Sequence, residues 1–226
     1  MGSLTAISPA LRLIDSPAVV STQTGVHPRL EEIVARHFKH AFLKPLALHT
    51  CAAYKTMLAI WKGKSPLILD AGCGSGDSTR YLAQQHTNSF VVGVDQSAHR
   101  LAKAPSLPEN AMLLRADVTD LWRLLASDQI KLSQHTWFYP NPWPKAEQVQ
   151  RRWYAHPAFT AVLALGGRLQ VRSNWQIFMH ELAVALKVAG YPPPPIVPIT
   201  PVQPISLHER KYQASQHPLY QLEIHL

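Results

Sequence analysis

Short apolar segments alternate with helical stretches between residues 67 and 188, and this alternation constrains the fold more than any other feature of the chain. The segments expected to form buried strands are 67–69, 90–94, 111–115, 136–139 and 168–171. The helical stretches that follow them are 76–85, a stretch from Ser97, 120–127, 148–165 and 174–188. Strands that alternate with helices pair in parallel and are covered on both faces, so this order predicts an α/β fold with a parallel sheet.

The segment before this alternation has a different character. Residues 1–25 are small and polar with scattered prolines, which predicts a loose arm. Residues 28–61 have a helical pattern that is interrupted at Pro45. We therefore expect an N-terminal arm and helical cover over residues 1–62, followed by one α/β domain over residues 63–226.

The C-terminal part of that domain carries two further patterns. Residues 191–204 are extended and rich in proline, so we expect a connector with no regular element there. Residues 220–226 alternate apolar and polar side chains, which predicts a closing strand at the edge of the sheet.

Composition limits the class of protein and its partners. The formal net charge is +8, which favours polyanionic partners such as nucleic acid, although a basic surface also serves solubility alone. Two cysteines indicate a reducing, cytoplasmic setting, and no apolar run is long enough to span a membrane. The twelve histidines lack the spacing of a metal site, so we expect no metal.

A glycine-rich turn joins the first expected strand to its helix. It contains Gly72, Gly74 and Gly76, with Asp70 two residues before the first glycine. Glycines allow a sharp turn close to a ligand, and the N-terminus of the following helix, with Asp77 or Ser78 as its cap, offers free amides. The spacing differs from the GxGxxG pattern of dinucleotide sites, so the turn favours a nucleotide without a pyrophosphate.

Two more acidic residues follow expected strands. Asp95 ends the second strand, where a carboxylate can accept hydrogen bonds from ribose hydroxyls. Asp117 follows the third strand and could accept a hydrogen bond from an adenine amine. The alternative interpretation is that both carboxylates cap helices. With the glycine turn, the three acids predict a nucleotide-cofactor site.

A proline-rich loop, residues 138–145, follows the fourth expected strand. Three prolines around a tryptophan stiffen the backbone and fix Asn141, Trp143 and Lys145 in place. Trp143 could stack on a base or pack the loop onto the core. The candidates for phosphate contacts are Lys145, Arg151 and Arg152, although the two adjacent arginines cannot face one direction and could simply be a solvated helix start.

The glycine turn and strand-end acids together resemble the class I methyltransferases that use S-adenosylmethionine. That resemblance implies a Rossmann-like, mostly parallel seven-stranded sheet whose last strand is antiparallel. The proline loop and the arginine pair further resemble the tRNA (guanine-N7) methyltransferase family, whose loop reads Asp-Pro-Trp-x-Lys. The segments 173–175 and 206–209 resemble that family's Thr-Asp-Trp and Thr-x-Phe-Glu.

The resemblance implies site residues, and two of them depart from the family pattern. It places Asn141, Lys145 and Asn174 in the catalytic site, and Ser206 and Glu209 with Trp143 and the arginines at the substrate. Asn141 and Asn174 stand where the family carries aspartate. Glu209 is hypothesised to replace some of the lost negative charge by folding over the pocket.

Three functions agree with these residues. The first is methyl transfer to a guanine N7 in tRNA, which needs orientation but no general base because N7 carries no proton. The second is methyl transfer to an exocyclic amine of adenine or cytosine, held through the Asn141 carbonyl, or to a small molecule. The third is RNA binding by a catalytically weakened paralogue.

Overall fold

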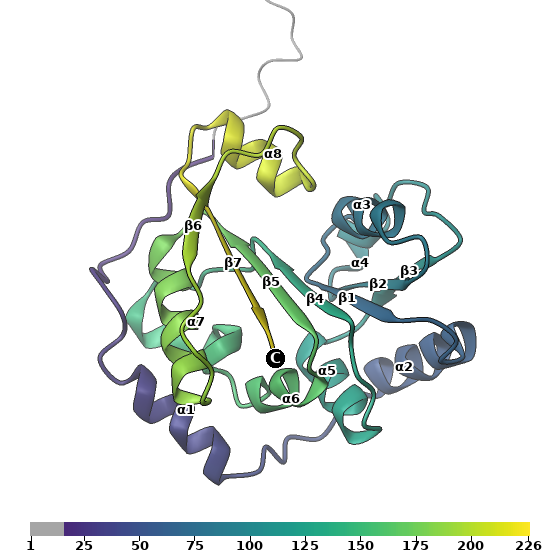
Figure 1. The fold of residues 1–226 in the computed structure, drawn as a ribbon, viewed down its shortest axis with the longest axis horizontal. Helices are drawn as coiled ribbons and strands as arrows, with labels where there is room; N and C mark the ends of the chain where they lie inside the picture. Colours follow the sequence, from purple (N-terminus) through teal and green to yellow (C-terminus); the bar gives the residue numbers. More distant parts are fainter. Residues whose placement is uncertain (1–15) are drawn as a thin grey trace, which may run out of the picture.

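A seven-stranded sheet with strand order β3-β2-β1-β4-β5-β7-β6 forms the centre of the protein (Figure 1). The computed structural model describes residues 16–226, so the first fifteen residues of the predicted arm lie outside the described residues. Strands β1 to β5 are parallel, and β7 runs antiparallel between β5 and β6. The predicted α/β fold with a mostly parallel sheet is confirmed.

The elements follow the predicted alternation. The strands are β1 Leu67–Ala71, β2 Phe90–Asp95, β3 Ala111–Arg115, β4 Gln134–Phe138, β5 Arg168–Ser173, β6 Ile196–Ile199 and β7 Leu219–His225. The helices are α1 Leu30–Lys39, α2 Leu48–Trp61, α3 Asp77–Gln85, α4 Ala98–Leu101, α5 Val118–Ser127, α6 Phe159–Leu165, α7 Gln176–Val188 and α8 Leu207–Ala214.

Apolar clusters lie on both faces of the sheet. The larger one joins the β1 residues Leu67 and Leu69 to apolar side chains of α1, α2, α5, α6 and α7. The smaller one joins Ile68, between them in sequence, to Leu82 of α3 and Ile205 before α8. Because β1 and β2 are buried along their whole length, each begins with a continuous apolar run rather than an alternating one, and Asp70 and Asp95 stand near their carboxyl ends.

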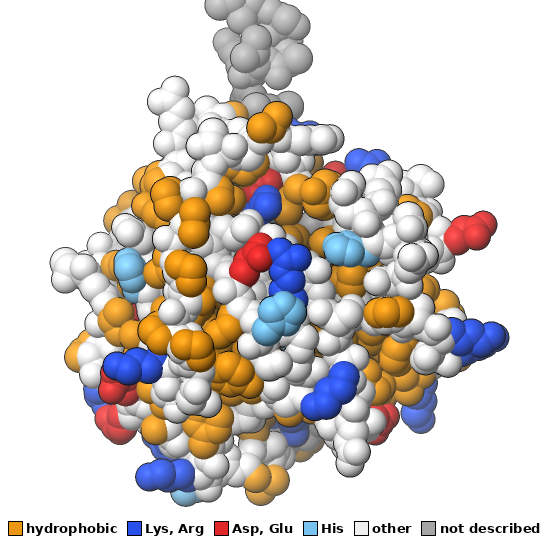
Figure 2. All heavy atoms as spheres, viewed as in Figure 1, with side chains coloured by type: hydrophobic (Ala, Val, Ile, Leu, Met, Phe, Trp, Pro, Cys, Tyr) orange, Lys and Arg blue, Asp and Glu red, His pale blue; other side chains and the backbone are white. Residues whose placement is uncertain are grey.

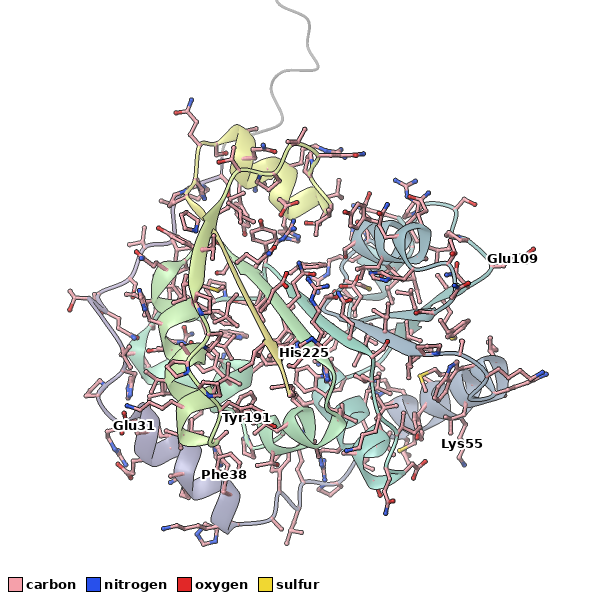
Figure 3. All side chains as sticks on the ribbon, viewed as in Figure 1. Glu31, Phe38, Lys55, Glu109, Tyr191 and His225 are labelled. Carbon is pink, nitrogen blue, oxygen red and sulfur yellow. The ribbon has the colours of Figure 1, made fainter. Side chains whose placement is uncertain are left out.

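The side of β5 and β7 opposite α7 is polar. Figure 2 shows charged side chains gathered over these strands, where Arg168 and Glu223 form an ion pair. His225, at the end of β7, is exposed on this side (Figure 3). Strand β5 consequently alternates between buried and partly exposed residues, as expected for a strand with one face toward solvent.

The N-terminal cover is helical, and α1 and α2 are separated by the segment that contains Pro45, as predicted. Residues 16–27 do not form a loose arm. Ser21 Oγ donates a hydrogen bond to the Pro144 carbonyl at 2.5 Å, and the backbone N–H of His27 donates to Glu181 at 2.8 Å. These contacts hold the segment against the α/β domain.

Three local predictions were wrong. Residues 148–165 do not form one helix: two 3-10 segments, η2 (Ala146–Arg151) and η3 (Trp153–Ala155), precede α6. The backbone is extended at Arg152 and at His156, which precedes a proline that disfavours helical geometry there.

The other two concern the C-terminal segments. Residues 191–204 contain β6, which tolerates Pro198 because it lies at the edge of the sheet. Strand β7 therefore lies inside the sheet and not at its edge. Across residues 16–226, every helix is too short or too polar to cross a membrane.

Candidate functional site

A cavity of about 610 Å³ opens at the carboxyl ends of β1, β2, β3 and β4. It is bordered by the glycine turn and strand-end acids on one side and by the proline loop on the other. The lining residues that the argument uses are Gly72, Gly74, Asp95, Asp117, Asn141 and Trp143. In an open parallel sheet, this edge is where ligands bind.

The glycine turn takes the backbone shape that its sequence predicts. Gly74 has a φ of +61°, and no atom lies within 4 Å of the position that a Cβ would occupy there. Gly76 has a φ of +86° and immediately precedes α3, where a Cβ would lie 2.9 Å from Leu113. Gly72 and Gly74 line the cavity, whereas Gly76 does not.

Asp70 lies beneath the turn and does not line the cavity. It is fully buried and accepts hydrogen bonds from the hydroxyls of Ser78, Thr79 and Thr136 at 2.6, 2.7 and 3.0 Å. Burial raises the pKa of this carboxyl, and the three hydrogen bonds oppose the rise. Asp70 therefore ties the turn to α3 and β4.

Neither predicted cap of α3 acts as one. Ser78 donates its hydroxyl to Asp70, and Asp77 accepts from Ser75 Oγ at 2.6 Å. The residue at the cap position is Gly76, and no side chain caps this helix.

Asp95 and Asp117 both line the cavity, and both also bind backbone amides. Asp95 accepts from the N–H of Gly74 at 3.0 Å and of Ser97 at 2.7 Å, and pairs with Arg100 at 2.8 Å. Asp117 caps α5 through Oδ1, which accepts from the Thr119 N–H at 2.8 Å. Its Oδ2 has no hydrogen-bond partner among residues 16–226, so the cap and ligand interpretations are compatible.

The proline loop presents Asn141 and Trp143 to the cavity. Asn141 Oδ1 accepts from the Trp143 N–H at 3.1 Å, which leaves the amide N–H groups for a ligand. Trp143 has a φ of +47°, and the Arg151 guanidinium lies 4.8 Å from the centre of its ring. Lys145 is exposed and lies outside the cavity lining.

The prediction that Arg152 contacts phosphate was wrong. Its side chain is fully buried in an ion pair with Glu181, while Arg151 lines the cavity. The extended backbone at Arg152 turns its side chain inward and so separates the two arginines.

The residues predicted from β5 and α8 lie away from the cavity. Asn174 borders a second cavity of about 560 Å³, where its Nδ2 lies 3.0 Å from His217 Nδ1. Ser206 caps α8. Glu209 is fully buried, pairs with Arg172 at 2.8 Å and accepts from the Tyr139 hydroxyl at 2.6 Å. The hypothesis that Glu209 supplies negative charge to the pocket was wrong, because Arg172 neutralises it and the protein covers it.

Several cavity residues were not anticipated: Lys44, Arg100, His156, His208 and Tyr212. Burial lowers the pKa of His156, whose Nδ1 accepts from the Ala158 N–H at 3.1 Å, so its Nε2 carries the proton in the neutral ring. Burial and Arg100 lower the pKa of His208. Lys44, His156 and Tyr212 belong to no motif that the sequence analysis used. His208 lies within the segment 206–209, and Arg100 is held at the cavity by its ion pair with Asp95.

Comparison with known proteins identifies the family. A family model described as "Putative methyltransferase" (Methyltransf_4) matches residues 64–222. The chain belongs to this methyltransferase family. It is 31% identical over 170 residues to the tRNA (guanine-N(7)-)-methyltransferase of Mycobacterium avium (strain 104), and 27% identical over 177 residues to that of Mycolicibacterium gilvum (strain PYR-GCK). The matches cover 68% and 67% of this chain and 64% of each relative.

Solved methyltransferases share the fold. An antibiotic-related methyltransferase and the 16S rRNA methyltransferase KamB each superpose with a TM-score of 0.57, at 14% and 16% sequence identity. Each covers 76% of this chain, and the matches span 94% and 93% of those two structures. Within the described part of this methyltransferase family member, no three His, Cys, Asp or Glu side chains are grouped to hold a metal.

Proposed function

We propose that this protein transfers a methyl group from S-adenosylmethionine to N7 of a guanine in tRNA. The observation that carries the proposal is the juxtaposition of the glycine turn, Asp95 and Asp117 with the proline loop around one cavity. The named function of the mycobacterial relatives supports it.

The residues at one end of the cavity fit an adenosine-bearing cofactor. Gly74 offers open space against its backbone, and the free Oδ2 of Asp117 can accept from an amine. Asp95 Oδ2 accepts one hydrogen bond, from Gly74, and has capacity for a hydroxyl. S-adenosylmethionine would supply an electrophilic methyl group here, held by Gly72, Gly74, Asp95 and Asp117.

The proline loop favours guanine over an exocyclic amine. Asn141 Oδ1 accepts from the Trp143 N–H, and the amide N–H groups of Asn141 are available to a ligand. These donors match the O6 acceptor of guanine, whereas an amine substrate would have to share Oδ1 with the Trp143 N–H. Trp143 supplies a partly exposed aromatic face on which a base can stack.

The rim of the cavity favours a polyanionic substrate. Lys44, Arg100 and Arg151 border it, and only Asp95 and Asp117 among its lining residues are acidic. Such a rim attracts phosphates and makes binding depend on salt. A small-molecule substrate would not need it.

The decisive experiment is transfer of labelled methyl from S-adenosylmethionine to unmodified bulk tRNA, followed by nucleoside analysis. The expected product is 7-methylguanosine. Label on an exocyclic amine would contradict the guanine assignment, and no label despite binding of S-adenosylhomocysteine would contradict the activity. An Asn141→Asp variant distinguishes a weakened enzyme: if it alone transfers label, the natural amide has abolished the chemistry.

A further inference from the structure

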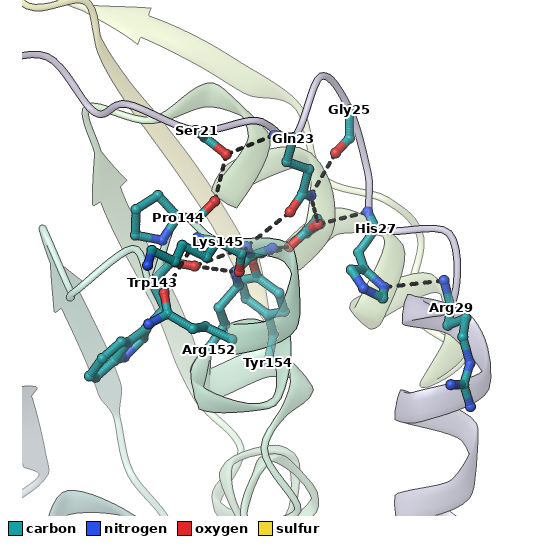
Figure 4. A network of polar contacts seen from close by, with 12 residues as sticks. Ser21, Gln23, Gly25, His27, Arg29, Trp143, Pro144, Lys145, Arg152 and Tyr154 are labelled. Carbon is teal, nitrogen blue, oxygen red and sulfur yellow. Dashed lines mark hydrogen bonds and ion pairs between the residues drawn. The ribbon is translucent and has the colours of Figure 1, made fainter.

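A buried polar network connects the N-terminal segment to the proline loop (Figure 4). Its centre is the ion pair of Arg152 and Glu181, both fully inaccessible to solvent. Glu181, from α7, also accepts from the Tyr154 hydroxyl at 2.6 Å and from the His27 N–H at 2.8 Å. Two buried charges are thereby paired and hydrogen-bonded, as burial requires.

The arginine of this pair holds the backbone of the loop. Its Nε and Nη2 donate to the Trp143 carbonyl at 3.2 and 2.9 Å, and Nη2 lies 3.3 Å from the Lys145 carbonyl. Trp143 has a left-handed backbone, which is unfavourable for a side chain of this size and persists only when its surroundings fix it. Trp143 in turn donates its N–H to Asn141, so the side chain that faces the cavity depends on the same backbone.

Gln23 completes the network from outside the α/β domain. Its Oε1 accepts from Arg152 Nη2 at 3.0 Å, and its Nε2 donates to Glu181. Two residues earlier, Ser21 Oγ donates to the Pro144 carbonyl at 2.5 Å. The segment 21–27 thus contacts both members of the ion pair and the loop itself.

We propose that Gln23, Arg152 and Glu181 are positioning residues, which fix Asn141 and Trp143 for the base without touching it. The N-terminal segment then helps to position the substrate loop and does not only cover the sheet. This inference rests on the proposed function for its kinetic consequence, but its structural consequence, a fixed loop, does not depend on the substrate.

The test compares Gln23→Met, which keeps the length of the side chain but removes its hydrogen bonds, with Thr24→Ala at the exposed neighbouring position. Trypsin is the first probe because Lys145 precedes the 3-10 segment η2 next to the loop and Arg151 is its last residue. We expect cleavage after these residues, followed by mass spectrometry, to be about tenfold faster in Gln23→Met than in wild type or Thr24→Ala.

Kinetics and cofactor binding provide the second probe. In Gln23→Met we expect kcat/KM for tRNA to fall about tenfold or more while the Kd for S-adenosylhomocysteine stays within about twofold. Glu181→Gln leaves Arg152 without its counter-charge. We expect it to speed trypsin cleavage and to lower kcat/KM for tRNA more than Gln23→Met does.

Three results would overturn the inference: unchanged cleavage in Gln23→Met, unchanged kcat/KM with active wild-type enzyme, or an equal loss of cofactor binding that indicates general destabilisation. If wild-type protein methylates no tRNA, the proposed function fails, and the cleavage rates still decide whether Gln23 fixes the loop.

Discussion

We expect His135 to lower the free energy of unfolding at acidic pH, and a substitution of this residue should remove that effect. The residue lies on β4 and is 1% exposed, and its ring Nε2 lies 2.7 Å from the Gly166 carbonyl, to which it donates. Its Nδ1 has no hydrogen-bond partner among the described residues. Protonation would therefore place a charge on a buried atom with no acceptor, and burial lowers the pKa of His135 from 6.5 to about 4.

The sign follows from the lowered pKa. Between pH 6.5 and pH 4 the unfolded chain binds a proton at His135 that the folded protein does not, so the free energy of unfolding falls as the pH falls. The stabilisation is complete above pH 6.5 and is lost as the pH approaches 4. One pKa unit corresponds to about 1.4 kcal/mol, so the loss between pH 7 and pH 5 is about 2 kcal/mol.

The assay is urea unfolding at pH 7 and pH 5 for wild type, His135→Gln and the control His49→Gln, which alters an exposed residue of α2. Half-buried histidines whose pKa values are also lowered, such as His37 and His156, contribute to the acid dependence of all three proteins, so the difference between variants isolates His135. We expect His135→Gln to lose about 2 kcal/mol less than wild type between the two pH values. An acid dependence equal to that of wild type would refute the reasoning.

Two further predictions concern packing and the cavity rim. Gly93→Ala places a Cβ 2.2 Å from Thr79 Oγ1 and 2.6 Å from Leu113 Cδ2, so we expect a loss of about 1–3 kcal/mol and a lower melting temperature; unchanged melting would contradict the packing at β2. Arg151→Ala removes a rim cation and its contact with Trp143, so tRNA affinity should fall and the slope of log affinity against log salt should decrease by about one. A slope equal to that of wild type in filter binding would exclude a phosphate contact at Arg151.

The fold could be predicted from sequence where burial is continuous and local. Strands β1 and β2 are buried along their whole length and apolar except near their carboxyl ends, where Asp70 and Asp95 stand, and that pattern is visible in the sequence. Strand β6 was missed because four residues with a proline carry no periodic signal, and it forms only by pairing with β7. The break at Arg152 was missed because no glycine or proline adjoins it in the sequence.

The site residues also divide into those that local sequence predicts and those that depend on distant partners. Gly72, Gly74, Asp95 and Asp117 border one cavity because the carboxyl ends of parallel strands meet at one edge, whereas Asp70 and Gly76 do not line it. Their role in cofactor binding stays a prediction. Arg152 and Glu209 were misplaced because their partners are distant in sequence: Glu181 is 29 residues from Arg152, and Arg172 is 37 residues from Glu209. Which of two adjacent arginines faces solvent cannot be predicted without such a partner.

These distant pairs fix the shape of a loop that has no carboxylate of its own and that we propose as the substrate loop. Glu209, neutralised by Arg172, accepts from the hydroxyl of Tyr139 at the start of the loop. Glu181 acts through Arg152 on the backbone of Trp143 near its end. Both Tyr139 and Trp143 have left-handed backbones. Each of these strained residues is therefore held by a buried carboxylate, Tyr139 directly and Trp143 through Arg152.

Asn141, whose side-chain amide is neutral, lies between Tyr139 and Trp143 in the loop. Glu209 and Glu181 thus fix the shape of the loop and do not line the cavity. Methyl transfer to an unprotonated ring nitrogen needs alignment more than it needs a base, and alignment alone can contribute about 7–11 kcal/mol. Under the proposed function, a rigid loop with an amide can meet this need. We therefore expect the activity to be more sensitive to the loss of the Glu209 or Glu181 contacts than to a restored negative charge at Asn141.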